Sequence, residues 1–198
     1  MWAKELVDCA ARWKEGDLFG GRILPKYPSG LPIPATKSNF FRSAYVIADW
    51  ELPEGEFPVD NIWGPNMIVR RRVFDSGLRF DPSIGPRGSN YIMGSESEFC
   101  RRAHAAGYKS IYVPASLVHH QIRPEQLTHS WIRGRAFRTG RSSAVTDNFK
   151  SNLVLNIPRF KIRKLVTDYI RYMYSYIHGG KSEKLERAIS LHNTRGYI

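Results

Sequence analysis

The apolar positions along this chain follow two periods. Helical spacing of three and four residues recurs in six segments, and short apolar runs bounded by glycine, proline or charged residues lie between them. The segments predicted to be helical are 2–14, 73–76, 95–106, 124–139, 158–178 and 182–192. The segments predicted to be strands are 18–24, 62–69, 109–113 and 117–120. Strands that alternate with helices predict an α/β domain.

Turn-forming residues define the expected ends of several segments. Ser95-x-x-Glu98 is a capping-box pattern, so Ser95 is expected to begin a helix and Glu98 to cap it. Gly140 is expected to stop the fourth helix. Residues 25–58 are rich in proline and weakly periodic, which predicts a long ordered loop with short strands, and long loops are often functional.

The charge of the chain narrows the choice of partners. Thirty Lys and Arg against eighteen Asp and Glu give a net charge of +12, which favours phosphorylated substrates, anionic lipid or nucleic acid. The sequence has no zinc-finger spacing and no RNA-binding aromatic strand, and its basic residues extend along the whole chain. We therefore expect no nucleic-acid partner.

The cysteines and the N-terminus indicate a compartment. Cys9 and Cys100 form no Cys-x-x-Cys pair, so we expect two buried free thiols in a reducing environment. Charges at Lys4, Glu5 and Asp8 exclude a signal peptide there, and no apolar stretch approaches the ~20 residues of a membrane span. These features predict a cytoplasmic protein, and a peripheral position at the inner face of the membrane is the alternative.

A longer series of motifs extends from Gly64 to Arg141. It reads Gly64-Pro65-Asn66-Met67-Ile68-Val69-Arg70-Arg71, Gly77-x-x-Phe80-Asp81 and Gly94-Ser95-Glu96-Ser97-Glu98-Phe99, then Ala106-Gly107-Tyr108, Pro114, His120 and Arg135. This order and spacing resemble the acceptor side of a family 2 glycosyltransferase with the GT-A fold. The resemblance implies a partial GT-A mixed sheet flanked by helices over 1–145, followed by a C-terminal helical extension over 146–198.

The same resemblance implies a reaction and a missing part. Family members transfer a sugar from a nucleotide diphospho-sugar to a hydroxyl with inversion, and the acceptor here would be a glycan, such as a cell-envelope polysaccharide, or a lipid-linked molecule. The nucleotide-binding half, with its Asp-x-Asp motif, would lie before Met1, because every aspartate in this chain stands alone. Activity would then require that half, and this chain would be a fragment.

Glu96 is the candidate catalytic residue. Attack by an acceptor hydroxyl needs a general base, and a carboxylate near a helix N-terminus is stabilised in its charged form. The position of the family's base falls on Glu96, although the preceding family glutamate is Ser95 here. The alternative is that Glu96 only complements the helix N-terminus.

His120 is the candidate metal ligand. In the resembling family, a histidine after the proline segment completes a site for Mn²⁺ or Mg²⁺ together with the Asp-x-Asp carboxylates, and imidazole suits Mn²⁺. Adjacent strand residues point to opposite faces, so only one of His119 and His120 is expected to face the site. An ordinary, partly buried histidine is the alternative.

Five further residues are candidates for binding the substrates. The resemblance places arginines of the group 133, 135, 138 and 141 near the nucleotide diphosphate, and Arg135 and Arg138 lie three apart on one helical face. It places Gly64, Asn66 and Asp81 beside the sugar pocket, where an asparagine offers both a donor and an acceptor. Surface arginines and a turn shaped by Gly64 and Asn66 are the alternatives.

Two basic segments allow more than one interpretation. Arg70-Arg71-Arg72 is interpreted as a solvated basic edge, and contact with a phosphate is the alternative. Segment 158–178 combines basic residues with an apolar stripe that includes Leu165, Tyr169 and Ile177. A helix packed on its own domain explains the stripe, and peripheral contact with an anionic membrane is the alternative.

Three functions are therefore compared. The first is a glycosyltransferase that needs its donor-binding half. The second is an inactive remnant that acts as a binding module, since no Asp-x-Asp is present to hold metal and diphosphate. The third is a basic protein that binds a membrane surface.

Overall fold

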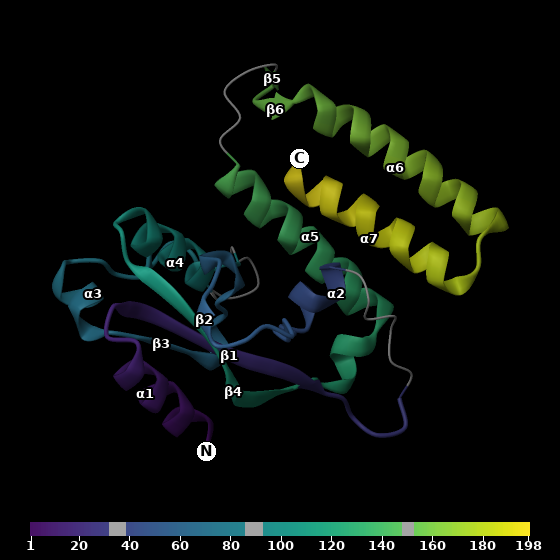
Figure 1. Cartoon of the computed structure of the whole chain (residues 1–198). Helices are drawn as coiled ribbons and strands as arrows, with labels where there is room; N and C mark the ends of the chain where they lie inside the picture. Colours follow the sequence, from purple (N-terminus) through teal and green to yellow (C-terminus); the bar gives the residue numbers. More distant parts are fainter. Residues whose placement is uncertain (32–38, 86–92, 148–152) are drawn as a thin grey trace. The chain divides into compact units, whose positions relative to one another are not determined.

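The computed structural model describes residues 1–31, 39–85, 93–147 and 153–198 (Figure 1). The chain divides into two compact units, a sheet unit drawn mostly from residues before Arg123 and a helical unit drawn mostly from Arg123–Ile198. The boundary between these units falls ahead of the domain boundary expected after residue 145. The division into domains stays a prediction, because compactness alone does not define a domain.

The sheet unit holds a four-stranded mixed sheet with the order β2-β4-β1-β3. Its strands are β1 (Gly16–Lys26), β2 (Gly55–Glu56), β3 (Met67–Val69) and β4 (Lys109–Gln121). β1 and β4 are parallel, whereas β3 and β2 pair antiparallel to β1 and β4 at the two edges. The prediction of an α/β fold with helices flanking a mixed sheet is confirmed at this level.

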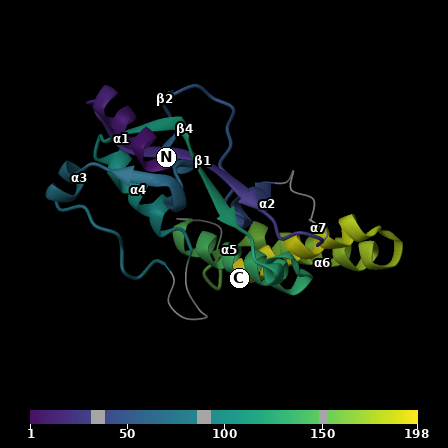
Figure 2. The ribbon, with the colours of Figure 1, turned by 90° about the horizontal axis from the view of Figure 1, so that it is seen from below.

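Alternation along β1 and β4 builds a core on each face of the sheet. Leu18 and Phe19 belong to different cores, as do Ile111 and Tyr112, because successive side chains of a strand point to opposite faces. Phe19 and Ile111 pack against α1 (Trp2–Arg12), while Leu18 and Tyr112 share a core with α4 (Ser95–Ala105). Both views show α1 and α4 on opposite sides of the sheet (Figures 1 and 2).

Three local predictions differ from the structure. The strands predicted at 109–113 and 117–120 form the single strand β4, and the strand predicted at 62–69 begins only at Met67, after a 3-10 turn. The capping box of α4 is absent: Gly94 occupies the N-cap with a φ of 98° and no side chain caps the helix. Glu98 forms an ion pair with Arg102 instead, because the two lie one helical turn apart.

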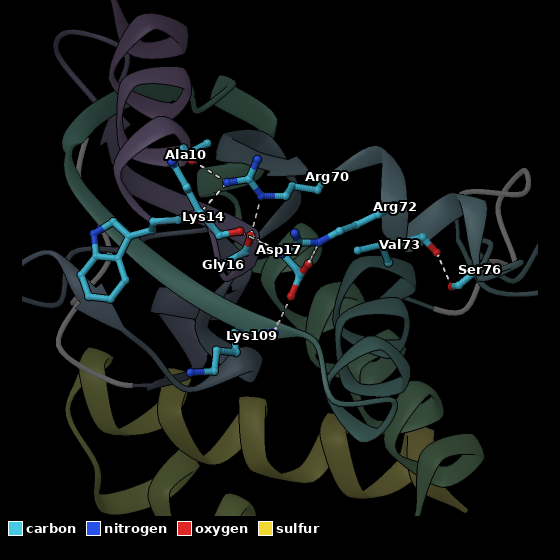
Figure 3. Close-up of polar contacts among 10 residues, drawn as sticks. Ala10, Lys14, Gly16, Asp17, Arg70, Arg72, Val73, Ser76 and Lys109 are labelled. Atoms are coloured by element: carbon cyan, nitrogen blue, oxygen red, sulfur yellow. Dashed lines mark hydrogen bonds and ion pairs between the residues drawn. The ribbon is translucent and has the colours of Figure 1, made fainter.

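The basic edge predicted at Arg70-Arg71-Arg72 is only partly solvated: Arg71 and Arg72 are exposed, but Arg70 is half-buried, and both Arg70 and Arg72 contact neighbouring segments (Figure 3). Arg70 donates to the Ala10 carbonyl and, at 3.0 Å, to the Trp13 carbonyl at the C-terminal end of α1. Arg72 pairs with the buried Asp17 at 2.5 Å. Two arginines therefore tie α1 and β1 to α3 (Arg71–Asp75), and cations suit the helix C-terminus.

Three long helices form most of the helical unit. They are α5 (His129–Thr146), α6 (Arg159–His178) and α7 (Lys181–Tyr197). A 3-10 turn (Pro124–Leu127) precedes α5, and a small hairpin of β5 (Leu153–Val154) and β6 (Ile157–Pro158) leads into α6. Within this unit α7 packs against both α5 and α6 (Figure 1).

The prediction that Gly140 stops the fourth helix is wrong. α5 continues to Thr146, and Gly140 is buried where α7 crosses it. A Cβ on Gly140 would lie 1.9 Å from the Asn193 carbonyl oxygen, and one on Gly196 would lie 1.9 Å from that of Phe137. These two glycines let the helix backbones touch, so glycine acts here in packing and not in termination.

Most of the apolar stripe of α6 does not pack on its own unit, so that interpretation was wrong for all of the stripe except the half-buried Ile162 and Leu165. The contact of α6 with α7 runs through buried Asp168, which accepts from Lys164 and from Thr194, each at 2.7 Å. Tyr169 and Ile177 of the stripe are 56% and 70% exposed. Residues spaced by three and four define two faces on this helix, and the polar face makes the contact with α7.

Candidate functional site

The Glu96 carboxylate lies directly against the backbone of Gly64. A Cβ on Gly64 would lie 2.5 Å from Oε1 of Glu96, so glycine is what permits this approach. Glu96 stands in the first turn of α4, and the hydroxyl of Ser95 donates to its Oε2 at 3.0 Å. Glu96 is half-buried. The structure therefore brings together two predicted site residues from different motifs.

Asn66 is buried at an irregularity between β1 and β4. The register shifts between Gly21 and Arg22, where Pro114–Ser116 have no partner in the ladder. The Asn66 amide donates to the carbonyl of Arg22 at 2.8 Å and to that of Ser116 at 3.0 Å, and it accepts from the Ser116 hydroxyl at 3.0 Å. Asn66 thus satisfies polar groups at the bulge, and its sugar-binding role stays a prediction.

Asp81 holds its own turn. It accepts from the backbone N–H of Ser83 at 2.7 Å and from the Ser83 hydroxyl at 2.6 Å, the arrangement of an Asx turn. These contacts are local and include neither Gly64 nor Glu96. A role of Asp81 toward a sugar stays a prediction.

His120 is oriented by a backbone carbonyl. Its Nδ1 lies 2.6 Å from the carbonyl oxygen of Tyr45, and because a carbonyl only accepts, Nδ1 carries a proton and Nε2 is the ring nitrogen left for another partner. Histidines that bind metals in proteins show this same second contact. His120 is half-buried while His119 is exposed, which fits the alternation of a strand.

The residues that the structure describes do not by themselves fit the metal implied by the family. Over 1–31, 39–85, 93–147 and 153–198 there is no cluster of three or more His, Cys, Asp or Glu that could hold an ion. His120 alone offers one imidazole, whereas a protein site for Mn²⁺ or Mg²⁺ is built mainly from oxygen ligands. Its role as a ligand stays a prediction, and we derive no reaction step through a metal.

An arginine-lined pocket of about 460 Å³ lies in the helical unit. Its arginines come from one face of α5, and α7 contributes one histidine. The lining residues are Ser130, Arg133, Gly134, Phe137, Arg138, Arg141 and His192. Arg138 is therefore in the pocket as part of a basic group, whereas Arg135 lies on another face of α5 and contacts the sulfur of Met93 at 2.7 Å.

His192 was not anticipated from the sequence. Burial, followed by the positive charges of Arg195 and Arg133, lowers the pKa of His192 below its usual value. The pocket is thus a site where positive charge is already costly, and an anion placed there would relieve the repulsion. The pocket residues of α5, such as Ser130, Gly134 and Arg141, recur at helical spacing, so the sequence could have shown that they share a face. No local pattern in the sequence connects them with His192 of α7.

A second pocket, of about 440 Å³, lies in the sheet unit and contains no predicted site residue. It is lined by Glu56, Phe57, Pro58, His104, Gly107, Tyr108, Lys109 and Ser110. The predicted site residues therefore lie in separate places. Gly64 and Glu96 are in contact, and Asn66 follows Gly64 by two positions in the sequence. Asp81 and His120 lie elsewhere in the sheet unit, and Arg135 and Arg138 lie in the helical unit.

Comparison with known proteins gives one informative relative. Over 151 residues the chain is 26% identical to the glucosyl-dolichyl phosphate glucuronosyltransferase of Haloferax volcanii. The chain is similar to a glycosyltransferase. The similarity covers 74% of this chain and 46% of the relative, so the chain spans about half of that protein's length.

The other comparisons add no closer definition of the family. No family model matches the chain, and no solved structure is significantly similar to it. A glycosyltransferase-like chain with a mixed α/β sheet is what the relative and the structure support together. None of the helices in the described ranges is long and apolar enough to cross a membrane.

Proposed function

We propose that this chain forms the acceptor-side part of an inverting glycosyltransferase of family 2 with the GT-A fold. The hydroxyl oxygen of the acceptor attacks the anomeric carbon of a nucleotide diphospho-sugar. The bond from that carbon to the diphosphate breaks, and its electron pair leaves with the diphosphate. The acceptor proton passes to Glu96. The donor-binding residues are supplied by sequence outside this chain.

The contact between Glu96 and Gly64 carries this proposal. A general base must hold a carboxylate at a fixed place and leave one oxygen free to take a proton. The hydroxyl of Ser95 donates to Oε2 of Glu96, and the backbone of Gly64 lies beside Oε1. These two contacts hold the carboxylate in place. The similarity to a glycosyltransferase supports assigning this carboxylate to sugar transfer.

The acceptor in this proposal is a glycan linked to a lipid phosphate. The relative's name describes a transferase acting on a glucosyl-dolichyl phosphate, a lipid-linked sugar. The pocket that contains Arg133, Arg138 and Arg141 supports a phosphate ligand, because guanidinium groups match phosphate oxygens in geometry and charge.

The test is turnover of the full product of the natural gene with Glu96→Gln. We expect kcat to fall by about 10²–10⁴-fold, the usual effect of losing a general base, while KM for the donor changes little. Glu98→Gln is the matched control, because Glu98 lies on the same helix and pairs with Arg102. Unchanged turnover in Glu96→Gln contradicts the assignment.

A non-catalytic binding module is the second candidate. The chain has Ser95 where the family's glutamate stands and no Asp-x-Asp motif. If the full gene product binds a glycan acceptor but never transfers a sugar to it, this second function is the correct one.

A further inference from the structure

The most unusual surface of the helical unit is an apolar face on α6. Six of its apolar or aromatic side chains recur at spacings of three and four, so they share one side of the helix. This apolar face consists of Val166, Tyr169, Ile170, Met173, Tyr176 and Ile177, each at least 42% exposed. An exposed group of this kind usually marks a contact surface.

The hairpin that leads into α6 presents a second apolar feature. Leu155 is 89% exposed and lies at the tip, between β5 and β6. Its φ of 51° and the φ of 63° at Asn156 are left-handed, a conformation that glycine or asparagine adopts with less strain than leucine. A leucine that is both strained and exposed to solvent has no role in the packing of this unit.

The charge of the molecule is concentrated in the same region. Residues 123–198 carry fifteen Lys and Arg against five Asp and Glu, whereas residues 1–122 carry fifteen against thirteen. Almost all of the net charge of +12 therefore belongs to residues 123–198. The two parts have equal numbers of basic residues, and the difference lies in the acidic residues, which are fewer in the C-terminal part.

α6 itself exposes no negative charge. Its single acidic residue, Asp168, is 4% exposed and pairs with Lys164. Its first turn has Arg159 and Lys161 and no acidic residue, although a helix N-terminus favours anions. Positive charge at this place is costly in the isolated protein and becomes favourable against an anionic surface.

We propose that the apolar face of α6 and the tip at Leu155 bind the interface of an anionic membrane, with α6 lying parallel to the surface. Tyrosine suits this depth because its ring is apolar and its hydroxyl can reach water. Basic residues beside the apolar face meet the lipid phosphates. A second copy of this chain is a poorer occupant, since it would bring two strongly basic regions together. The inference concerns binding alone and stands whether or not the protein transfers sugars.

The test is sedimentation of the full chain with vesicles. Vesicles of equal parts phosphatidylglycerol and phosphatidylcholine should bind the protein, and vesicles of phosphatidylcholine alone should bind it weakly. Ile170→Glu with Ile177→Glu should lower the partition coefficient by about tenfold or more, because two exposed apolar groups no longer enter the interface. Leu155→Asp should lower it separately.

The matched control is Val7→Glu, an equally exposed apolar position on α1, which should bind like the parent. Circular dichroism should show all variants folded, since each site is exposed. Failure of the parent chain to bind anionic vesicles overturns the proposal, as does equal binding by the Ile170 and Ile177 double variant. A dimer in solution that the double variant dissociates, without vesicle binding, would assign the face to a second copy instead.

Labelling adds an independent measurement. An environment-sensitive dye on Ile177→Cys should brighten and shift to the blue with anionic vesicles, while the same dye on Val7→Cys should not change. Cys9 and Cys100 are fully buried, so the label should attach selectively. An unchanged spectrum at position 177 contradicts insertion.

Discussion

Asn66 and Asp17 are buried polar side chains whose partners include backbone groups of distant segments. Asn66 serves two carbonyl groups at the bulge of the sheet, and Asp17 accepts from the backbone N–H of Lys109 at 3.0 Å as well as from Arg72. The sequence marked Asn66 through its Gly-x-Asn spacing, but it could not show these partners, because long-range contacts leave no local pattern. A motif residue can therefore define the shape of a site without touching its ligand.

Replacement of Asn66 tests this structural role. Asn66→Ala removes the side-chain donor that serves the carbonyls of Arg22 and Ser116, and we expect a loss of about 1–3 kcal/mol in the free energy of unfolding. Urea titration followed by circular dichroism measures the loss. Asn61→Ala, at a half-exposed asparagine nearby, should change stability by less than about 0.5 kcal/mol. Equal effects in both variants would show that the bulge does not depend on Asn66.

The two thiols should be unreactive in the native protein. Burial raises the pKa of Cys9 to about 11 and that of Cys100 to about 12, so almost no thiolate forms near neutral pH. Iodoacetamide at neutral pH should label neither residue until denaturant is added, and mass spectrometry can locate the adducts. Modification of native Cys9 at the rate of a free thiol would be inconsistent with its position between α1 and the sheet.

At the scale of elements, periodicity located the helices well and the ends of strands poorly. α1, α4 and α6 lie close to their predicted ranges, since each repeats apolar residues over several turns, whereas α7 continues to Tyr197, beyond its predicted end at residue 192. β4 was predicted as two strands because Pro114 interrupts its apolar run, yet the bulge absorbs the interruption without ending the pairing. The face of α6 that contacts α7 was mispredicted because a hydrophobic stripe does not show what covers it.

The crossing of α5 and α7 depends on two glycines. Gly140→Ala or Gly196→Ala would place a methyl group 1.9 Å from a carbonyl oxygen of the other helix, so the helices must separate. We expect each variant to lose about 1–3 kcal/mol of stability or more, measured as a lower thermal midpoint.

Gly134→Ala is the matched control on α5. A Cβ there would meet only the mobile end of Arg138, at 3.3 Å, and alanine favours a helix over glycine. This variant should be unchanged or up to about 1 kcal/mol more stable. If Gly140→Ala behaved in the same way, the close crossing of the two helices would be disproved.

At the scale of the whole molecule, net charge alone could not distinguish the sites that use it. The sequence showed +12, whereas the structure locates three arginines around one pocket and an acid-free exposed surface on α6. Resemblance to a glycosyltransferase named Glu96 and Gly64 as separate candidates, one catalytic and one beside the sugar pocket, and only the structure shows that they are in contact. It could not reveal His192, since α7 lies beyond the motif series and only folding brings it to α5.

The response of the molecule to anions should depend on pH through His192. Because the pKa of His192 is lowered in the folded state, its contribution to stability is present above its usual pKa, near 6.5, and is lost as the pH falls through that value toward the folded pKa. An anion in the pocket offsets the charges of Arg133 and Arg195 and so raises the pKa of His192. Anion binding therefore takes up a proton, and it tightens as the pH falls through the raised pKa of the anion-bound state.

Sulfate is a suitable probe because its charge is constant across this pH range. At constant ionic strength, low millimolar sulfate should raise the thermal midpoint more at pH 5.5 than at pH 8, since a ligand stabilises in proportion to its occupancy. His192→Gln should remove that difference while retaining stabilisation by the arginines. His178→Gln, at an exposed histidine on α6, should leave it intact. A pH difference that survives in His192→Gln would place the responsible anion site outside the arginine pocket.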